Sequence, residues 1–465
     1  MTRLHEHSLI IDGVKRTSHP TPAVGPGVLR KVIVAAAIGN FVEWFDFAAY
    51  GFLATVLTRV FFPSDTPSIA LLKAFAVFAV AFALRPLGGI VFGVIGDRIG
   101  RKRTLALTIL MMAGATTLIG ILPSYASIGL AAPALLTLVR CIQGFSAGGE
   151  YAGACAYVME HAPRTQRGKY GSFIPVSTFL SFAVAATVAY VLSAVLTPSQ
   201  LDAWGWRIPF LAAAPIGFIG VYLRLSLSET PAFQVVAQEH AIAHSPLKDT
   251  LRTQGGKIIA LSLFISVTAL SFYMFTTYLA TYMQVAGGLS RNAALLITVI
   301  SLVFAGASCP LAGLFTDAVG RRKTMASVCV YLIVAVYPCF ALAGSGSFAS
   351  ALLGVLILSI GAVLSGVVTA TLLSEVFPTR TRYTASAITY NVAYTIFGGT
   401  APLVATYLIG VTGNKMSPAA YMIAISVMGL IGGLTLKESS KVSLHHTDDE
   451  PYANPLAGNA PADLV

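Results

Sequence analysis

Charged residues are scarce in this chain of 465 residues, of which only 11% are Asp, Glu, Lys or Arg. Soluble domains carry roughly 25% charged residues. Because 56% of the residues are hydrophobic, too little polar surface remains to keep a folded globule in solution. The composition argues against a cytosolic enzyme, a disordered scaffold and a nucleic-acid-binding domain. It indicates a protein that crosses a membrane many times.

Motifs of catalysis and metal binding are scarce as well. The G-x-x-x-x-G-K-[ST] motif of nucleotide-driven pumps does not occur in the sequence. The pattern G-x-S-x-G at 144–148 lies inside an apolar run, whereas a nucleophile elbow requires a turn between strand and helix. We therefore expect no enzyme activity, no metal and no cofactor. The cysteines lack zinc-site spacing, so we interpret them as small buried hydrophobes: Cys141, Cys155, Cys309, Cys329 and Cys339.

Long apolar runs dominate the chain, and a membrane helix needs about 20 such residues. The runs predict an all-α membrane protein with twelve transmembrane helices in two six-helix bundles, 31–226 and 257–436. An N-terminal tail (1–30), a linker (227–256) and a C-terminal tail (437–465) complete the organisation. The expected spans are 31–58, 70–95, 104–122, 129–159, 170–196, 208–226, 257–284, 292–315, 324–343, 349–374, 384–411 and 417–436.

The basic residues are unevenly distributed between these spans. Most of the 30 Lys and Arg residues fall in the tails, the linker and alternate loops, which the positive-inside rule assigns to the cytoplasm. Both termini are then cytoplasmic, and the net charge of +11 reflects membrane topology, not nucleic-acid binding. Residues 1–30 lack the apolar core of a cleavable signal peptide.

An internal repeat divides the chain. Segment 96–103 (GDRIGRKR) returns as 316–323 (TDAVGRRK), and Glu160, Pro163 and Arg167 return as Glu375, Pro378 and Arg382. Each copy follows the corresponding span of its half, so two six-helix units follow one another in the same orientation. Parallel half-repeats with a substrate site between them are typical of transporters.

These motifs are similar to those of a known family. Segments 93–102 (GVIGDRIGRK) and 140–144 (RCIQG) resemble signatures of the major facilitator superfamily, although Ala318 replaces a basic residue in the second loop copy. Segments 39–47, 85–89, 143–151, 204–210 and 229–233 resemble its metabolite:proton symporter family. The resemblance is strongest to the proline/betaine members, which implies proton-coupled uptake of a small zwitterion across a bacterial cytoplasmic membrane.

Two departures leave the substrate open. The osmoregulatory member ends in a coiled coil, whereas 437–465 has no heptad pattern, and Arg140 replaces its lysine, as in the organic-acid members. The alternative cargo is a carboxylate metabolite such as 2-oxoglutarate, citrate or shikimate. A drug:proton antiporter is disfavoured because 170–196 contains only Pro175 and lacks that group's glycine–proline signature. A non-transporting sensor is the remaining class. The expected partners are the solute, protons and the lipid bilayer, and the chain is expected to be monomeric.

Charges inside the expected spans mark functional candidates, since each is unfavourable in the bilayer core. Glu43 and Asp46 lie one helical turn apart, and Tyr50 continues their face. Two close carboxylates resist double ionisation, so one of them can carry a proton. The alternative is a structural pairing of these acids with Arg85 or Arg140. We predict proton-coupling roles for Glu43, Asp46 and Glu150.

The fourth span carries Arg140, Gln143 and Glu150 on one face. Arg140 and Glu150 are about 15 Å apart along a helix, so each needs a partner elsewhere. Arg140 either binds a substrate carboxylate or forms a fixed ion pair with Glu43 or Asp46. The glycines at 144, 148, 149 and 153 are expected to pack helices closely.

Aromatic residues with helical spacing suggest a cage for a quaternary ammonium group, or else ordinary helix packing. Phe275, Tyr278 and Tyr282 form one stripe, Tyr390 and Tyr394 another, and Trp44 adds a wall. The residues expected at the substrate site are Arg140, Gln143, Trp44, Tyr50, Arg85, Tyr278, Tyr390 and Asn391. The loop repeats are expected to form a conformational latch, or to set topology alone: Asp97, Arg98, Arg101, Lys102, Asp317, Arg321 and Arg322.

Overall fold

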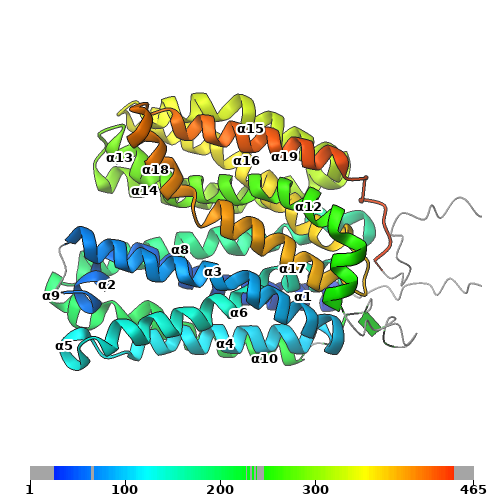
Figure 1. The fold of residues 1–465 in the computed structure, drawn as a ribbon, viewed down its shortest axis with the longest axis horizontal. Helices are drawn as coiled ribbons and strands as arrows, with labels where there is room; N and C mark the ends of the chain where they lie inside the picture. Colours follow the sequence, from blue (N-terminus) through cyan, green and yellow to red (C-terminus); the bar gives the residue numbers. More distant parts are fainter. Residues whose placement is uncertain are drawn as a thin grey trace, which may run out of the picture.

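A computed structural model describes residues 26–63, 67–226, 228–230, 233–234, 237 and 246–444. Helices form nearly all of this part, and no strand occurs within it. Figure 1 shows the helices lying side by side along the long axis in two groups, one from each half of the chain. The predicted all-helical fold is confirmed.

The first group contains six long helices. Each follows one apolar run, because a backbone inside a bilayer must satisfy its hydrogen bonds within its own helix. The short helices α2 (Ala54–Phe61), α5 (Tyr125–Ile128), α7 (Arg167–Gly171) and α9 (Pro198–Gln200) connect them. The long helices are α1 (Pro26–Phe52), α3 (Pro67–Ile99), α4 (Arg101–Ile121), α6 (Ala131–His161), α8 (Phe173–Val195) and α10 (Arg207–Ser226).

The second group repeats this plan with two interruptions. A π-helical turn, η3 (Met274–Tyr278), joins α12 to α13, and another, η4 (Tyr394–Gly398), joins α17 to α18. The sequence predicted continuous spans at both places. The helices are α12 (Pro246–Tyr273), α13 (Leu279–Val285), α14 (Arg291–Val319), α15 (Arg321–Ala343), α16 (Phe348–Glu375), α17 (Arg382–Ala393), α18 (Ala401–Thr412) and α19 (Ser417–Thr435).

Eleven helical segments of the described residues are long and apolar enough to cross a membrane. The remaining long helix, α6, has 31 residues but is not one of the eleven. Arg140, Glu150 and Glu160 interrupt its apolar character. The twelfth span and the cytoplasmic position of the termini therefore stay predictions.

Small residues bring α3 and α6 into backbone contact. A Cβ atom at Gly144 would collide with the backbone of Ala81, and one at Gly148 with the backbone of Arg85 and Gly89. The predicted packing role of these glycines is confirmed. This close approach places Arg85, on α3, beside the functional face of α6.

Two glycine turns mark one end of the molecule, which we call the Gly100/Gly320 end. Gly100 links α3 to α4 with φ of 103°, and Gly320 links α14 to α15 with φ of 94°. Residues with side chains rarely adopt such angles. The two turns occupy equivalent positions in the sequence repeat, so both halves fold this loop in the same way.

Candidate functional site

A small cavity lies between the two halves, near the middle of the long helices. The space that it encloses has room for only about one water molecule. A solute the size of an amino acid therefore requires the lining to move apart. Residues of α1, α6 and α8 line it from the first half, and residues of α12, α16, α17 and η4 from the second: Trp44, Tyr151, Pro175, Thr178, Phe179, Thr268, Phe272, Ala362, Gly366, Tyr390 and Tyr394.

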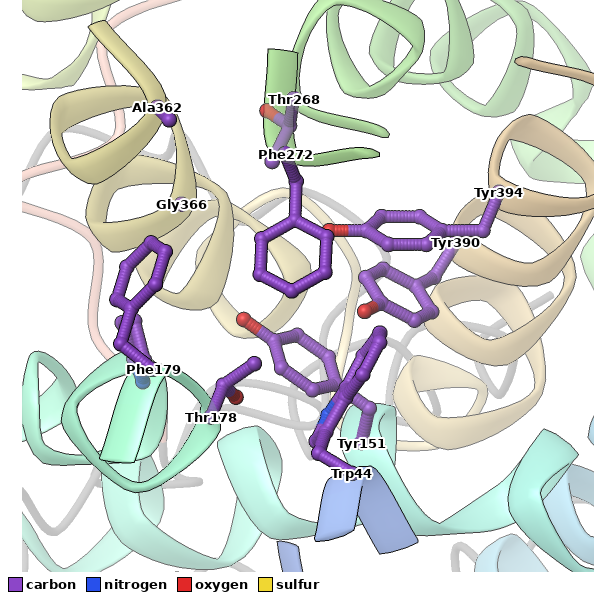
Figure 2. A pocket seen from close by; sticks show the side chains of 11 residues that line it. Trp44, Tyr151, Thr178, Phe179, Thr268, Phe272, Ala362, Gly366, Tyr390 and Tyr394 are labelled. Atoms are coloured by element: carbon purple, nitrogen blue, oxygen red, sulfur yellow. The ribbon is translucent and has the colours of Figure 1, made fainter. Parts of the chain in front are cut away.

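Aromatic rings dominate this cavity. Figure 2 shows Trp44, Tyr151, Phe272, Tyr390 and Tyr394 surrounding the space from different helices. The ring of Trp44 lies 5.1 Å from that of Phe272, while Tyr390 stacks against Tyr151 at 4.3 Å and against Tyr394 at 4.1 Å. Rings from both halves thus meet here, and their faces attract a cationic group.

Polar contacts fix the position of Trp44. Its indole nitrogen donates to the side-chain oxygen of Asn40 at 3.1 Å. The amide nitrogen of Asn40 donates to the hydroxyls of Ser177 and Thr178 on α8, both at 2.8 Å. The Gly39-Asn40 segment of α1 thereby holds a wall of the cavity in one orientation.

Beside the cavity lies a buried ion pair between Glu43 and Arg85. Glu43 Oε1 is 2.8 Å from Arg85 Nη2, and both side chains are fully buried. The guanidinium carbon of Arg85 lies 5.6 Å from the centre of the Trp44 ring. Arg85 Nε donates to Asn391 Oδ1 of the other half at 3.3 Å. This pair is therefore in contact with the aromatic lining and with both halves.

A second buried ion pair joins Asp46 to Arg140 at 2.8 Å. The same Arg140 nitrogen donates to Gln143 Oε1 at 3.0 Å, and Gln143 Nε2 donates to Thr116 at 2.9 Å. The guanidinium carbon of Arg140 lies 3.7 Å from the centre of the Tyr50 ring. The sequence left open whether these acids pair with the arginines, and the structure shows that both do.

Glu150 belongs to a third buried pair. Its Oε1 accepts from Arg224 on α10 at 3.1 Å, and its Oε2 accepts from Thr108 on α4 at 2.6 Å. The sequence indicated a partner for Glu150 on another helix, and the structure supplies Arg224. Arg224 lies in the expected span 208–226 but was not predicted as a functional candidate; the structure buries it fully inside α10.

At the Gly100/Gly320 end, Asp97 connects the halves. Its carboxylate accepts the backbone amides of Tyr383 at 3.1 Å and Thr384 at 2.9 Å, in the first turn of α17. Arg101 lies 3.4 Å from the same carboxylate. Glu160, which faces Arg101, pairs with Arg382 of the other half at 2.7 Å.

The second copy of the repeat forms the mirrored arrangement. Asp317 accepts the backbone amides of Gly168 and Lys169 at 2.7 and 2.8 Å. Arg321 pairs with Asp317 at 2.9 Å and with Glu375 at 3.0 Å. Glu375 also lies 3.5 Å from Arg167 of the first half. Each half thus reaches into the other with one aspartate and one glutamate.

Two further carboxylates, not predicted from the sequence, cap the repeated loops. Glu229 accepts the backbone amides of Arg101 at 3.0 Å and Lys102 at 3.2 Å, and Glu438 accepts those of Arg321 at 2.9 Å and Arg322 at 3.0 Å. Burial would raise the pKa of Glu438, but these backbone amides, with that of Ser440, lower it below the ordinary value of 4.5. Glu229 lies in segment 229–233 (ETPAF), one of the segments that resemble the family, but no role was predicted for this residue.

The predicted site residues fall in different places. Trp44 and Tyr390 line the cavity, while Arg85 and Asn391 lie directly behind it. Tyr278 does not line it; its ring packs 6.1 Å from that of Tyr282. In the loops Lys102 and Arg322 contribute backbone amides, and the Arg98 side chain is exposed. Tyr151 and Phe272 are lining residues that were not predicted, since isolated aromatics in apolar runs carry no signal of their own.

The C-terminal segment after α19 packs across the Gly100/Gly320 end. Ser439 donates to Glu375 at 2.9 Å, and Arg167 of the first half donates to the carbonyl of Val442 at 2.7 Å. Thr379 of the second half donates to the carbonyl of Leu444 at 2.8 Å. This segment is therefore held by both halves.

Comparison with known proteins agrees with this geometry. Residues 36–402 match the model of the Major Facilitator Superfamily. The chain is 36% identical over 448 residues to the proline/betaine transporter of Salmonella typhimurium, covering 94% of this chain and 87% of the relative. It is 36% identical over 435 residues to the ectoine/proline transporter ProP of Corynebacterium glutamicum, covering 90% and 86%.

Solved structures share the fold. The proton:xylose symporter XylE bound to 6-bromo-6-deoxy-D-glucose superposes with a TM-score of 0.75 at 18% identity, covering 90% of this chain and 98% of that one. The inward open conformation of the xylose transporter XylE from E. coli gives 0.60 at 17% identity, covering 88% and 97%. The fold, the inter-half cavity and the sequence relatives lead to one conclusion: this chain is a multi-pass membrane transporter that belongs to the Major Facilitator Superfamily.

Proposed function

We propose that this transporter takes up a small zwitterionic solute of the proline/betaine type together with protons, by alternating access, in the bacterial cytoplasmic membrane. The observation that carries the proposal is the aromatic cavity between the halves with two buried ion pairs beside it. The chain acts as a monomer with both termini in the cytoplasm. Its two six-helix bundles, 31–226 and 257–436, rock about the cavity.

The cavity has the chemistry that a zwitterion needs. A quaternary ammonium group is attracted by ring faces such as those of Trp44, Phe272 and Tyr394. Its carboxylate needs a cation, and Arg85 lies behind the Trp44 ring. Relatives named as proline, betaine and ectoine transporters support the same class of solute.

Proton coupling is assigned to the buried carboxylates. Glu43, Asp46 and Glu150 each pair with one arginine inside the bundle. A buried ion pair is held together against a large desolvation penalty, so protonation of the acid frees the arginine and changes the balance between conformations. Of the three, Asp46 pairs with Arg140, which also contacts Gln143 and Tyr50. This linked set couples one proton to several helices.

The loop residues supply the latch. Contacts of Asp97 and Asp317 with the opposite half hold the Gly100/Gly320 end closed. Reorientation requires these contacts to break, so the latch sets the relative populations of the two facing states. The end that is closed is assigned to the cytoplasm by the basic loops that it carries.

A second candidate cargo is a carboxylate metabolite such as 2-oxoglutarate, citrate or shikimate. The observation that favours it is the pair of buried arginines, Arg85 and Arg140, since two carboxylates of one solute need two cations. Against it stands the aromatic lining, which offers little to an anion. A drug:proton antiporter would move its solute in the direction opposite to the proton. A non-transporting sensor would show no solute flux.

Uptake into proteoliposomes tests the proposal. Labelled betaine, proline, 2-oxoglutarate and citrate are offered with an inward proton gradient, with and without a protonophore. We expect protonophore-sensitive uptake of the zwitterions alone. Asp46→Asn and Glu43→Gln should each reduce gradient-driven accumulation, while Asp202→Asn, which breaks an exposed pair with Arg59, serves as the matched control. Uptake of the acids alone contradicts the zwitterion assignment, and unchanged accumulation in both acid variants contradicts the coupling assignment.

A further inference from the structure

Four buried side chains beside the cavity keep polar atoms without hydrogen-bond partners among the described residues. They are Glu43 Oε2, Arg85 Nη1 and the hydroxyls of Tyr273 and Tyr390. Glu43 Oε1 and Arg85 Nη2 are not among these atoms, because they satisfy one another in the ion pair at 2.8 Å. Buried polar groups are almost always satisfied in folded proteins, so this cluster calls for an explanation.

These atoms belong to one neighbourhood. Tyr390 lines the cavity, and Tyr273 and Tyr390 are both electrostatic neighbours of Arg85 and Glu43. Asn391 fixes the orientation of Arg85, because it accepts a hydrogen bond from Arg85 Nε. The amide nitrogen of Asn391 in turn donates to the carbonyl of Gly148 at 2.6 Å. The Nε atom is thus occupied by Asn391 and Nη2 by Glu43, while Nη1 has no partner among the described residues.

Arg140 is placed differently. Its guanidinium is enclosed by Asp46, Gln143 and the Tyr50 ring, and none of these three side chains lines the cavity. The Arg85 guanidinium lies 5.6 Å from the ring of Trp44, which lines the cavity, and 5.4 and 5.7 Å from the rings of Phe47 and Phe82. The two arginines therefore differ in their access to a bound solute, although both pair with an acid of α1.

We infer that Arg85 is the residue that binds the substrate carboxylate, and that Glu43 occupies its guanidinium while the site is empty. The inference rests on the proposed function and deepens it, since it assigns the two ends of the zwitterion to different subsites. The carboxylate meets the terminal nitrogens of Arg85 with the hydroxyls of Tyr273 and Tyr390. The cationic end lies among the rings of Trp44, Phe272 and Tyr394.

The exchange adds one positive charge to the site, that of the proton, because the zwitterion itself is neutral. The substrate carboxylate replaces the Glu43 carboxylate on Arg85, and Glu43 takes up one proton from solution to become neutral. No other bond is formed or broken. Arg140 keeps its pair with Asp46 throughout this step. The charged and titratable groups around Glu43 are Asp46 on α1, Arg85 on α3, Glu150, Tyr151 and Cys155 on α6, Tyr273 on α12, Tyr390 on α17 and Tyr394 in η4.

Equilibrium binding to the purified protein tests this assignment. Glycine betaine and choline, a quaternary ammonium ion without a carboxylate, are titrated calorimetrically into wild type and two matched double variants. Glu43→Gln/Arg85→Gln removes one buried pair without leaving a lone charge, and Asp46→Asn/Arg140→Gln removes the other. Loss of a charged hydrogen-bonding partner should weaken betaine binding about 10- to 100-fold in the first variant. Choline binding in that variant should stay within about threefold of wild type, and in the second variant any change should be the same for betaine and for choline.

A selective loss for betaine cannot come from a general structural defect, which would weaken both ligands alike. Equal weakening of betaine and choline, or wild-type betaine affinity in the Arg85 variant, overturns the assignment. If a double variant fails to fold, Arg85→Lys and Arg140→Lys take its place, since lysine keeps the charge and loses the planar fork.

The same titrations can refute the proposed function independently of the role of Arg85. If wild type binds 2-oxoglutarate but neither betaine nor choline, the zwitterion proposal is wrong. The same variants then decide the role of Arg85 with 2-oxoglutarate as the probe: a 10- to 100-fold loss confined to the Arg85 variant upholds it, and an unchanged affinity refutes it.

Discussion

The contact between Asp97 and the start of α17 makes a quantitative prediction for the latch. Asp97 is buried and accepts two backbone amides of the other half, those of Tyr383 and Thr384. Hydrogen bonds to charged groups contribute about 1.5–3 kcal/mol each, so the two together contribute at least about 3 kcal/mol to closure. In Asp97→Asn one neutral bond of about 1 kcal/mol remains. Closure should weaken by about 2 kcal/mol, which is roughly 30-fold in the conformational equilibrium.

A buried cysteine between the halves can report this shift. Ala152 of α6 packs in a small apolar cluster with Tyr383 and Ala387 of α17. In a background without the native cysteines, Ala152→Cys should react with a maleimide only when the Gly100/Gly320 end opens. We expect its labelling rate to rise roughly 30-fold when Asp97→Asn is added.

The control breaks an ion pair elsewhere. Asp202→Asn removes the partner of Arg59 in a pair whose side chains are 51% and 32% exposed for Arg59 and Asp202. Exposed pairs contribute little, so labelling of Ala152→Cys should not change. A folded Asp97→Asn protein whose labelling rate stays within twofold of its parent would refute the latch.

Three further predictions follow from packing and charge. Gly148→Ala should lower the free energy of unfolding of the detergent-solubilised protein by about 1–3 kcal/mol, because the added methyl group collides with the backbone of α3. Gly114→Ala should leave it unchanged, because no atom lies within 4 Å of the position of its methyl group. Glu150→Gln should destabilise the protein more than Asp202→Asn in the same assay, since it leaves Arg224 buried without its partner. Because its pKa is lowered below the ordinary value of 4.5, Glu438 contributes its full stabilisation above that pH and loses it as pH falls through the folded-state pKa. The difference in unfolding free energy between wild type and Glu438→Gln should therefore shrink as pH falls below 4.5, and a constant difference would contradict the capping role.

The sequence predicted the helices well because apolar runs and repeats are local signals. The helix bounds agree with the expected spans to within a few residues in most cases, and the repeated loops fold alike around Gly100 and Gly320. The π-helical turns η3 and η4 lie within two continuous helical segments, Leu247–Val285 and Arg382–Thr412, and were not predicted because a π-helical turn inserts a residue without changing the apolar composition. The start of α12 at Pro246 lies inside the segment expected to be a linker.

The pairing of charges could not be predicted, because it depends on distances between helices. The spacing of Glu43 and Asp46 placed both acids on one face, but it could not show that Glu43 pairs with Arg85 and Asp46 with Arg140. The position of Arg85, on α3, beside Trp44, on α1, likewise follows only from the packing of the helices. The capping role of Glu438 was likewise hidden, since it depends on the chain folding back over α15.

The C-terminal segment offers a practical handle on the transport cycle. Its anchors are Arg167 in the first half and Thr379 in the second, so they move apart when the halves separate at this end. A single extended segment cannot keep its hydrogen bonds to both halves when the halves move apart at this end. A fluorophore placed on this segment would therefore change its surroundings with every opening, and would follow turnover in single molecules without any label inside the membrane. A truncation before Val442 would remove both tethers and speed the opening step.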